Sequence, residues 1–141
     1  QPKETEWDGL SYVIMIEIAG VKEDSFRKDM FKAKRKDLAE IWSGEEYNVA
    51  NIVRFSPSAC NSQPWIVESE NNVLKIYRYK KPGKVGIMTP EKAYYFNRMD
   101  IGIFICILEI CLEHEGILFE GKQYPDEIDE EKVLVAEYTI K

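Results

Sequence analysis

The chain has 141 residues and a formal net charge of −6. Its length fits one domain, residues 1–141, and 45% apolar with 31% charged residues is typical of a globular protein rather than a disordered one. The acidic balance argues against nucleic acid as a partner, because phosphate binding needs a basic surface. Three cysteines without paired spacing indicate a reduced, cytoplasmic protein rather than a disulfide framework.

No segment of the sequence suggests a membrane partner. Residues 1–10 form a polar lead-in with a turn at Asp8-Gly9, unlike the basic and then apolar start of a signal peptide. The longest apolar run, Ile101–Leu108, is well short of the roughly 20 residues that a membrane span needs. Because the chain opens on Gln1 and soon enters a predicted strand, we expect it to lack an N-terminal segment of a longer protein.

The first predicted element is Ser11–Ala19 (SYVIMIEIA), whose β-branched and apolar residues predict a strand buried on both faces. A helix is the rival interpretation, which β-branching disfavours. The charged stretch that follows contains a basic cluster at Lys32, Lys34, Arg35 and Lys36. Such a run is more typical of a solvated face than of an anion site.

Two short helices and a hairpin are predicted next. Leu38–Trp42 indicates a short helical turn, and Tyr47–Phe55 has apolar residues at nearly helical spacing. Trp65–Glu68 and Val73–Tyr79 alternate like strands on either side of Asn71-Asn72. Because asparagine tolerates positive φ, this pair predicts a β-hairpin turn.

A long helix is the central predicted element. Thr89-Pro90-Glu91 supplies the hydroxyl cap, first-turn proline and carboxylate of a helix start, and Gly116 is a typical left-handed end. Ile101–Leu112 is apolar nearly all round, which predicts a buried helix, with a break conceivable near Asn97. Gly102 lowers helix propensity by roughly 1 kcal/mol, which indicates close approach of another backbone or a ligand.

A last strand is predicted at Val133–Ile140, after a turn at Tyr124-Pro125-Asp126. Together these elements predict an α+β fold, with a mixed sheet packed on a central buried helix.

The ten residues from Ser56 to Trp65 (SPSACNSQPW) form a loop between a predicted helix and a predicted strand. Pro57 and Pro64 stiffen both ends, and the residues between them offer many hydrogen-bonding groups. This composition predicts a rigid, preformed binding loop. The alternative is a helix-to-strand connection whose prolines and Trp65 are purely structural.

The loop resembles the Pro-Ser-x-x-Asn-x-Gln-Pro-Trp segment of the flavin-dependent nitroreductases, and six positions of the nine-residue motif match. In that family the segment forms part of the FMN site. The resemblance therefore implies that Pro57, Ser58 and Ala59 lie along the flavin ring or its ribityl edge. It also implies that Asn61 and Gln63 hydrogen-bond the flavin or hold its loop.

Two weaker similarities extend the resemblance, and one departure limits it. A Lys-Arg-Lys-x-Leu segment precedes the loop, and Asp100-x-Gly102 with Gly116 is similar to the family's central helix, which belongs largely to a dimer core. The resemblance thus implies a homodimer. The family's Arg-x-Ser-x-Arg cluster, which holds the FMN phosphate, has no match, so that anchor would come from a missing N-terminal segment or a second subunit.

Other catalytic classes find little support. His114 is the only histidine, and its place in the last turn of the predicted helix favours a structural role. Cys106 and Cys111 lie on that helix and are expected to be core thiols, and Cys60 lacks a basic neighbour in its loop that would activate it. No spacing predicts zinc, and no Gly-x-Gly-x-x-Gly predicts a dinucleotide fold.

The absence of a side-chain nucleophile or base suits a flavin enzyme, because the flavin performs the redox chemistry. The resemblance implies an FMN-dependent NAD(P)H oxidoreductase that passes hydride to a small-molecule electron acceptor, a nitroaromatic or a quinone. The alternative is a non-catalytic flavin-binding or structural α+β module. The loop favours the first interpretation, and the missing phosphate cluster favours the second.

Overall fold

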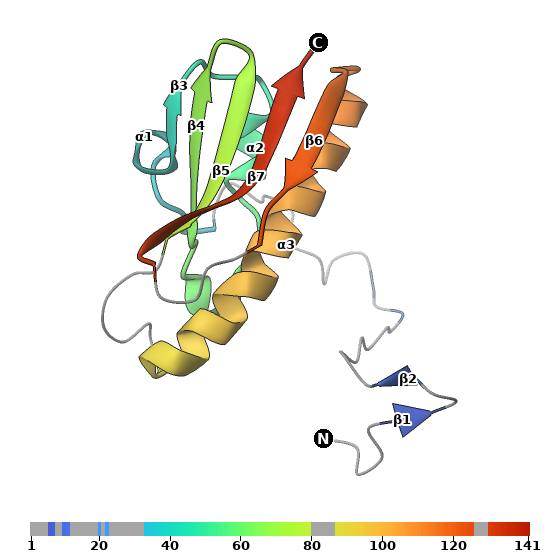
Figure 1. Ribbon diagram of the computed structural model, residues 1–141. Helices are drawn as coiled ribbons and strands as arrows, with labels where there is room; N and C mark the ends of the chain where they lie inside the picture. The colour runs from blue at the N-terminus through green and yellow to red at the C-terminus, as the bar shows by residue number, and fades with distance from the viewer. Residues whose placement is uncertain are drawn as a thin grey trace.

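The structure is a computed structural model that describes residues 6–7, 10–11, 20, 22, 33–79, 87–125 and 130–141. A five-stranded sheet lies in front of one long helix (Figure 1), which confirms the predicted α+β class. The sheet strands are β3 (Trp42–Gly44), β4 (Trp65–Glu70), β5 (Val73–Tyr79), β6 (Phe119–Gln123) and β7 (Lys132–Ile140). The helices are α1 (Leu38–Ile41), α2 (Ala50–Val53), the 3-10 turn η3 (Ala59–Asn61) and α3 (Pro90–His114).

Two short strands near the N-terminus, β1 (Glu6–Trp7) and β2 (Leu10–Ser11), pair antiparallel with each other. Their register places Trp7 opposite Leu10, on either side of the predicted Asp8-Gly9 turn. Beyond Ser11, the strand predicted up to Ala19 lies outside the described residues.

The five-stranded sheet is mixed, with the strand order β3-β4-β5-β7-β6. β3 and β4 run parallel, and the other neighbouring pairs run antiparallel. The predicted hairpin joins β4 to β5, and its two turn residues have positive φ, 52° at Asn71 and 61° at Asn72. Asparagine is one of the few residues that adopt this conformation readily, so these two residues fix the register of the hairpin.

Two edge strands were not predicted. Residues Trp42–Gly44 form β3 instead of completing a helical turn, and Gly44 has a φ of +87° there. A Cβ at Gly44 would lie 1.8 Å from the carbonyl oxygen of Ser69, so only glycine fits this approach to β4. β6 is an exposed edge strand with the polar sequence FEGKQ, which lacks the alternating pattern of a half-buried strand.

The ends of α3 follow the predicted signals. Thr89 is the extended N-cap residue and Pro90 occupies the first turn, but the Thr89 hydroxyl makes no capping hydrogen bond, so that part of the prediction is wrong. At the other end, Gly116 has a φ of +69° and donates to the Glu113 carbonyl at 3.0 Å, while Ile117 donates to the Leu112 carbonyl at 2.9 Å. The helix is continuous through Asn97, so the break considered there is absent.

One side of α3 packs against the inner face of the sheet. Trp65 of β4 is fully buried and stacks on Phe104 with ring centroids 4.8 Å apart, and Leu108 and Leu112 are also fully buried. The opposite side remains open, since Ile103 is 40% exposed and Ile110 is 58% exposed. The prediction of a helix buried all round is therefore wrong.

The prediction that both cysteines of this helix are core thiols is wrong for Cys106, which is exposed. Cys111 is half-buried and packs against the edge of the core. No helix in the described part of the chain has the length and apolarity to cross a membrane.

Candidate functional site

The predicted loop connects α2 to β4 and has an unusual backbone. Ser56 closes α2 by donating through its amide and its hydroxyl to the Val53 carbonyl, at 2.9 and 2.6 Å. Beyond it, three residues that are not glycine have positive φ, namely Cys60 at 48°, Asn61 at 54° and Gln63 at 48°. Each such residue costs free energy, so surrounding contacts must hold the loop in this shape.

Asp100 of α3 provides the first of these contacts. Its side chain is buried, with 3% of its surface exposed, and it accepts the Ala59 amide at 2.9 Å and the Ser62 hydroxyl at 3.1 Å. Burial raises the pKa of Asp100, while the two hydrogen bonds act in the opposite direction. Sequence reasoning noticed Asp100 only through its Asp-x-Gly resemblance, because its loop partners lie 41 and 38 residues away.

The basic segment before α1 holds the other side of the loop. Arg35 donates to the Asn61 side-chain oxygen at 2.8 Å. Lys36 donates through its backbone amide to the Gln63 side-chain oxygen at 2.8 Å, and through its ammonium to the Gln63 carbonyl at 2.9 Å. Both basic residues are half-buried, so the prediction of a solvated face is wrong for Arg35 and Lys36; Lys32 lies outside the described residues.

The five predicted site residues fall into two groups. Asn61 and Gln63 bind the basic segment, and Gln63 is 4% exposed, so their side chains shape the loop. Pro57 is exposed, while Ser58 and Ala59 are half-buried. The Ser58 hydroxyl accepts the Gln63 amide at 2.9 Å and thereby spans the loop. Ala59 packs against Met88 and Ala93, so Pro57 is the most accessible of these three small, neutral residues.

Three cations, Arg35, Lys36 and Arg54, lie beside the loop. Arg54 donates to the Lys36 carbonyl at 3.1 Å and stacks over the Phe55 ring at 4.4 Å, and Arg35 also donates to the Phe55 carbonyl at 3.3 Å. Their positive charge favours an anionic or electron-rich ligand at the loop. Among the described residues, no group of His, Cys, Asp and Glu side chains suits a metal ion.

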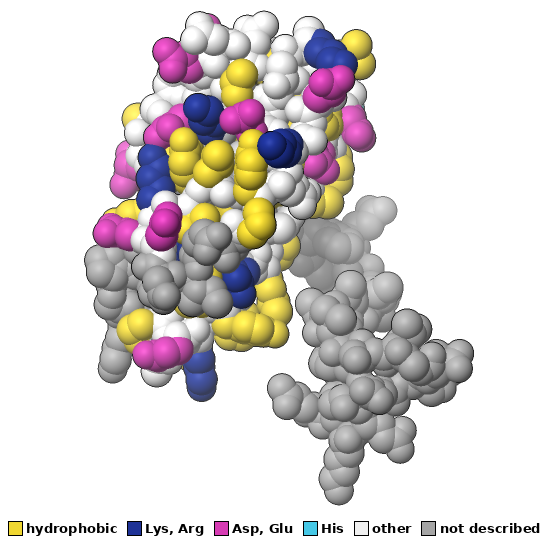
Figure 2. All heavy atoms as spheres, viewed as in Figure 1, with side chains coloured by type: hydrophobic (Ala, Val, Ile, Leu, Met, Phe, Trp, Pro, Cys, Tyr) yellow, Lys and Arg dark blue, Asp and Glu magenta, His cyan; other side chains and the backbone are white. Residues whose placement is uncertain are grey.

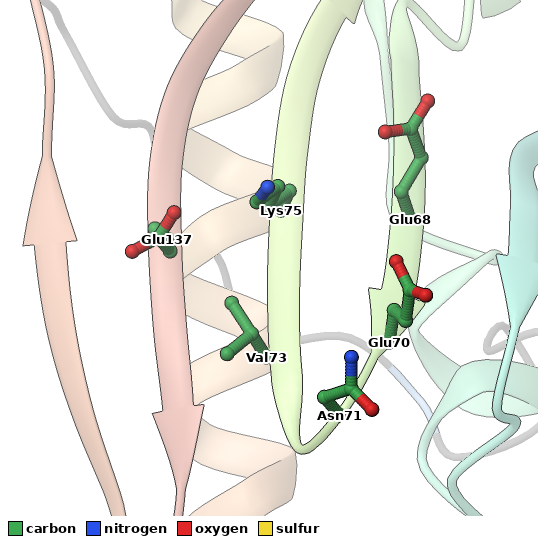
Figure 3. Close-up of a pocket in the computed structure, with 6 residues that line it drawn as sticks. All are labelled: Glu68, Glu70, Asn71, Val73, Lys75 and Glu137. Atoms are coloured by element: carbon green, nitrogen blue, oxygen red, sulfur yellow. The ribbon is translucent and has the colours of Figure 1, made fainter.

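A different hollow, of about 320 Å³, lies on the outer face of the sheet (Figure 3). It is lined by Glu68, Glu70, Asn71, Val73, Lys75 and Glu137. A hydrogen bond from Lys132 lowers the pKa of Glu68, and Lys75 acts in the same direction. Apolar side chains alternate with lysines and glutamates over this face (Figure 2), which is the pattern of an ion-paired surface rather than of a reactive site.

The structure is that of an α+β protein with a polar, hydrogen-bonded loop between a helix and the sheet. The family model described as "Putative TM nitroreductase" matches residues 1–111 of this chain. Since this match covers most of the 141 residues, the chain belongs to that nitroreductase-like family of oxidoreductases. No curated protein and no solved structure matches the chain.

Proposed function

We propose that this chain is part of an FMN-dependent NAD(P)H oxidoreductase of the nitroreductase type that works in the cytoplasm. The observation that carries the proposal is the loop itself. Asp100 and the basic segment hold it in a costly left-handed conformation, with Pro57 exposed and Ser58 and Ala59 half-buried. Strain of this kind is commonly kept where a ligand must be met by a preorganised surface.

The accessible part of the loop suits a flat, heteroatom-rich ring system. Pro57, Ser58 and Ala59 are small enough to allow close approach, and we assign them to the flavin ring or its ribityl edge. We assign Asn61 and Gln63 to holding the loop, because both side chains bind the basic segment, although Asn61 is also exposed. When bound, FMN supplies the hydride chemistry between NAD(P)H and a nitroaromatic or quinone acceptor.

The phosphate of FMN requires an anchor beyond this loop. Arg35 and Lys36 are the cations that contact the loop, and both already donate to loop oxygens. We therefore assign the phosphate contacts to a second subunit or to a further segment of the protein. Under this assignment, the loop and the phosphate contacts of one flavin site come from different subunits or from different segments of the protein.

We further propose a homodimer built on the open side of α3. Seven residues follow one another there at alternating spacings of four and three, the pattern of a helix-pairing seam: Lys92, Phe96, Met99, Ile103, Cys106, Ile110 and Glu113. Phe96 and Met99 are each 37% exposed, which is unusual for large apolar side chains. An antiparallel pair centred near Ile103 would place Lys92 opposite Glu113 of the second copy, whereas a parallel pair would oppose like charges.

The test is an absorption spectrum of the protein expressed from its full natural reading frame. We expect flavin bands near roughly 450 nm that bleach when NAD(P)H is added without oxygen. An Asp100→Leu variant should lose the bands, whereas Glu137→Gln, on the outer sheet face, should keep them. A colourless wild-type protein that also fails to take up added FMN would contradict the proposal and leave a structural module.

A further inference from the structure

A second hollow lies where α2 packs beside the C-terminal half of α3. It has a volume of about 310 Å³, and its wall is mainly apolar. Val49 and Ile52 line it from the α2 segment, and Ile110 and Cys111 line it from α3. Ile52 and Ile110 are both exposed. An apolar hollow whose walls remain open to solvent indicates a docking position for another apolar group.

The hollow continues the seam of the proposed homodimer, because Ile110 lines the hollow and also belongs to the seam. The antiparallel register of that seam pairs Lys92 of one copy with Glu113 of the other. Moving four positions inward from each member of this pair brings Phe96 of the second copy level with Glu109, next to Ile110. The register therefore places an aromatic side chain at the mouth of the hollow.

Phe96 and the hollow lie on the same side of α3. His114, which lines the hollow, is 18 positions after Phe96, which is about five full turns of helix, so both side chains leave α3 in nearly the same direction. A two-fold axis that runs between antiparallel helices, perpendicular to them, brings this side of one copy beside the same side of the other. Phe96 of each copy consequently faces the hollow of its partner.

The Phe96 ring is exposed and already oriented. It is 37% exposed, and the Tyr95 ring packs edge-on against it, with ring centroids 5.5 Å apart. This contact restricts the rotation of Phe96 before association, which lowers the entropy cost of docking it. Lys92 lies one turn before Phe96, so the docked ring also brings a lysine to Glu113 of the other copy.

We propose, on the basis of the homodimer proposed above, that Phe96 of a second copy of this chain fills the hollow. Its ring lies against Ile52 and Ile110, and the reciprocal contact forms at the other end of the pair. The volume is at the lower end of the roughly 300–1,000 Å³ found for ligand pockets, which suits a single aromatic ring. The α2 segment thereby becomes part of the interface, which pairing of two α3 helices alone does not require.

The experiment is an isotope-filtered NOE measurement on the full chain, with methyl-labelled and unlabelled copies mixed in equal amounts. We expect NOEs between the Phe96 ring of the unlabelled copy and the Ile52 and Ile110 methyl groups of the labelled copy. A dimer, established by sedimentation equilibrium, that lacks these NOEs overturns the docking of Phe96 and leaves the proposed dimer standing. A monomer at every concentration overturns both.

Variants separate this contact from pairing of the two α3 helices alone. Phe96→Ala should weaken the dimer at least about tenfold, and Ile52→Ala should weaken it at least about threefold although it lies on α2. The double variant should be weakened less than the product of the two single effects, because the two side chains contact each other. Asn51→Ala, an exposed α2 residue outside the lining of the hollow, should leave the dimer unchanged.

Two results with these variants would contradict the proposal. If Ile52→Ala dimerises as tightly as wild type, the hollow is not part of the interface. If the effects of Phe96→Ala and Ile52→Ala multiply fully, the two side chains do not meet, and another group occupies the hollow. Either result overturns the docking of Phe96.

Discussion

Helix α3 has two apolar sides that differ in what covers them. Phe104 and Leu108 face the sheet and are at most 1% exposed, whereas Ile103 and Ile110 face away and keep 40% and 58% of their surface. The two sides are alike in residue type, so their sequence alone does not separate them. The apolar pattern of a helix indicates how much of its surface must be buried. Which element buries each side is determined by the tertiary structure.

The largest expected effect tests the covered side. Leu108→Ala should lower the free energy of unfolding by about 2–5 kcal/mol, because it removes a fully buried side chain and leaves a cavity. Ile103→Ala is the matched change on the open side and should cost less than about 1 kcal/mol in dilute protein. Urea unfolding measures both, and equal losses would contradict the distinction between the two sides.

A third side of α3 holds the loop Ser56–Trp65. Asp100→Leu should cost about 1–3 kcal/mol of unfolding free energy, because the Ala59 amide and the Ser62 hydroxyl lose their acceptor. Ser62→Ala removes one of the two bonds and should cost less. Amide hydrogen exchange at residues 58–63 should accelerate in Asp100→Leu. Unchanged exchange would show that other contacts hold the loop.

Substitutions on the open side of α3 should weaken the proposed dimer. Ile103→Glu should weaken the dimer at least about tenfold, or about 1.4 kcal/mol, because it places a charge in the proposed seam. Lys92→Glu should weaken it less, and adding Glu113→Lys should restore it by exchanging the two charges. Sedimentation equilibrium measures these changes, with Lys75→Glu on the outer sheet face as the control. A wild-type monomer at all concentrations would exclude the proposed dimer.

The smallest effect concerns pH. Burial raises the pKa of Asp100 above its ordinary value of 3.8. A carboxyl whose pKa is higher in the folded than in the unfolded state adds stability that is full below the unfolded value and is lost as pH rises through the folded value. Asp100→Asn cannot titrate, so wild type should lose stability relative to this variant as pH rises from about 3.8 towards neutrality.

A second variant sharpens the pH test. Ser62→Ala removes a hydrogen bond that lowers the pKa of Asp100, so the loss of stability with rising pH should extend to higher pH than in wild type. The measurement is the free energy of unfolding of wild type, Ser62→Ala and Asp100→Asn across the same pH series. A wild-type curve parallel to that of Asp100→Asn would mean that folding leaves the pKa of Asp100 unshifted and would contradict the account.

The elements that the sequence predicts well are those with local causes. The hairpin depends on Asn71-Asn72, and the ends of α3 depend on Pro90 and Gly116, so neighbouring residues are sufficient to place them. The polar edge strand β6 has no such signal, because pairing with β7 rather than its own pattern makes it a strand.

The loop shows the same limit at the candidate site. Its composition and motif predict a rigid binding loop, and the structure shows a loop held by hydrogen bonds from Lys36 and to Asp100. Its two supports were missed, because Asp100 and the segment around Arg35 are far from the loop in sequence and meet it only in the fold. The assignment of Asn61 and Gln63 to loop support therefore required the structure.

The central claim, that this loop meets the flavin, is tested most directly by titrating FMN into the isotope-labelled full-length protein and following its amide shifts. We predict saturable changes at Ser58, Ala59, Cys60 and Asn61, with none at Lys122 and Glu137 on the sheet. Saturable changes that spare these four loop amides, or none at any concentration, would contradict the account.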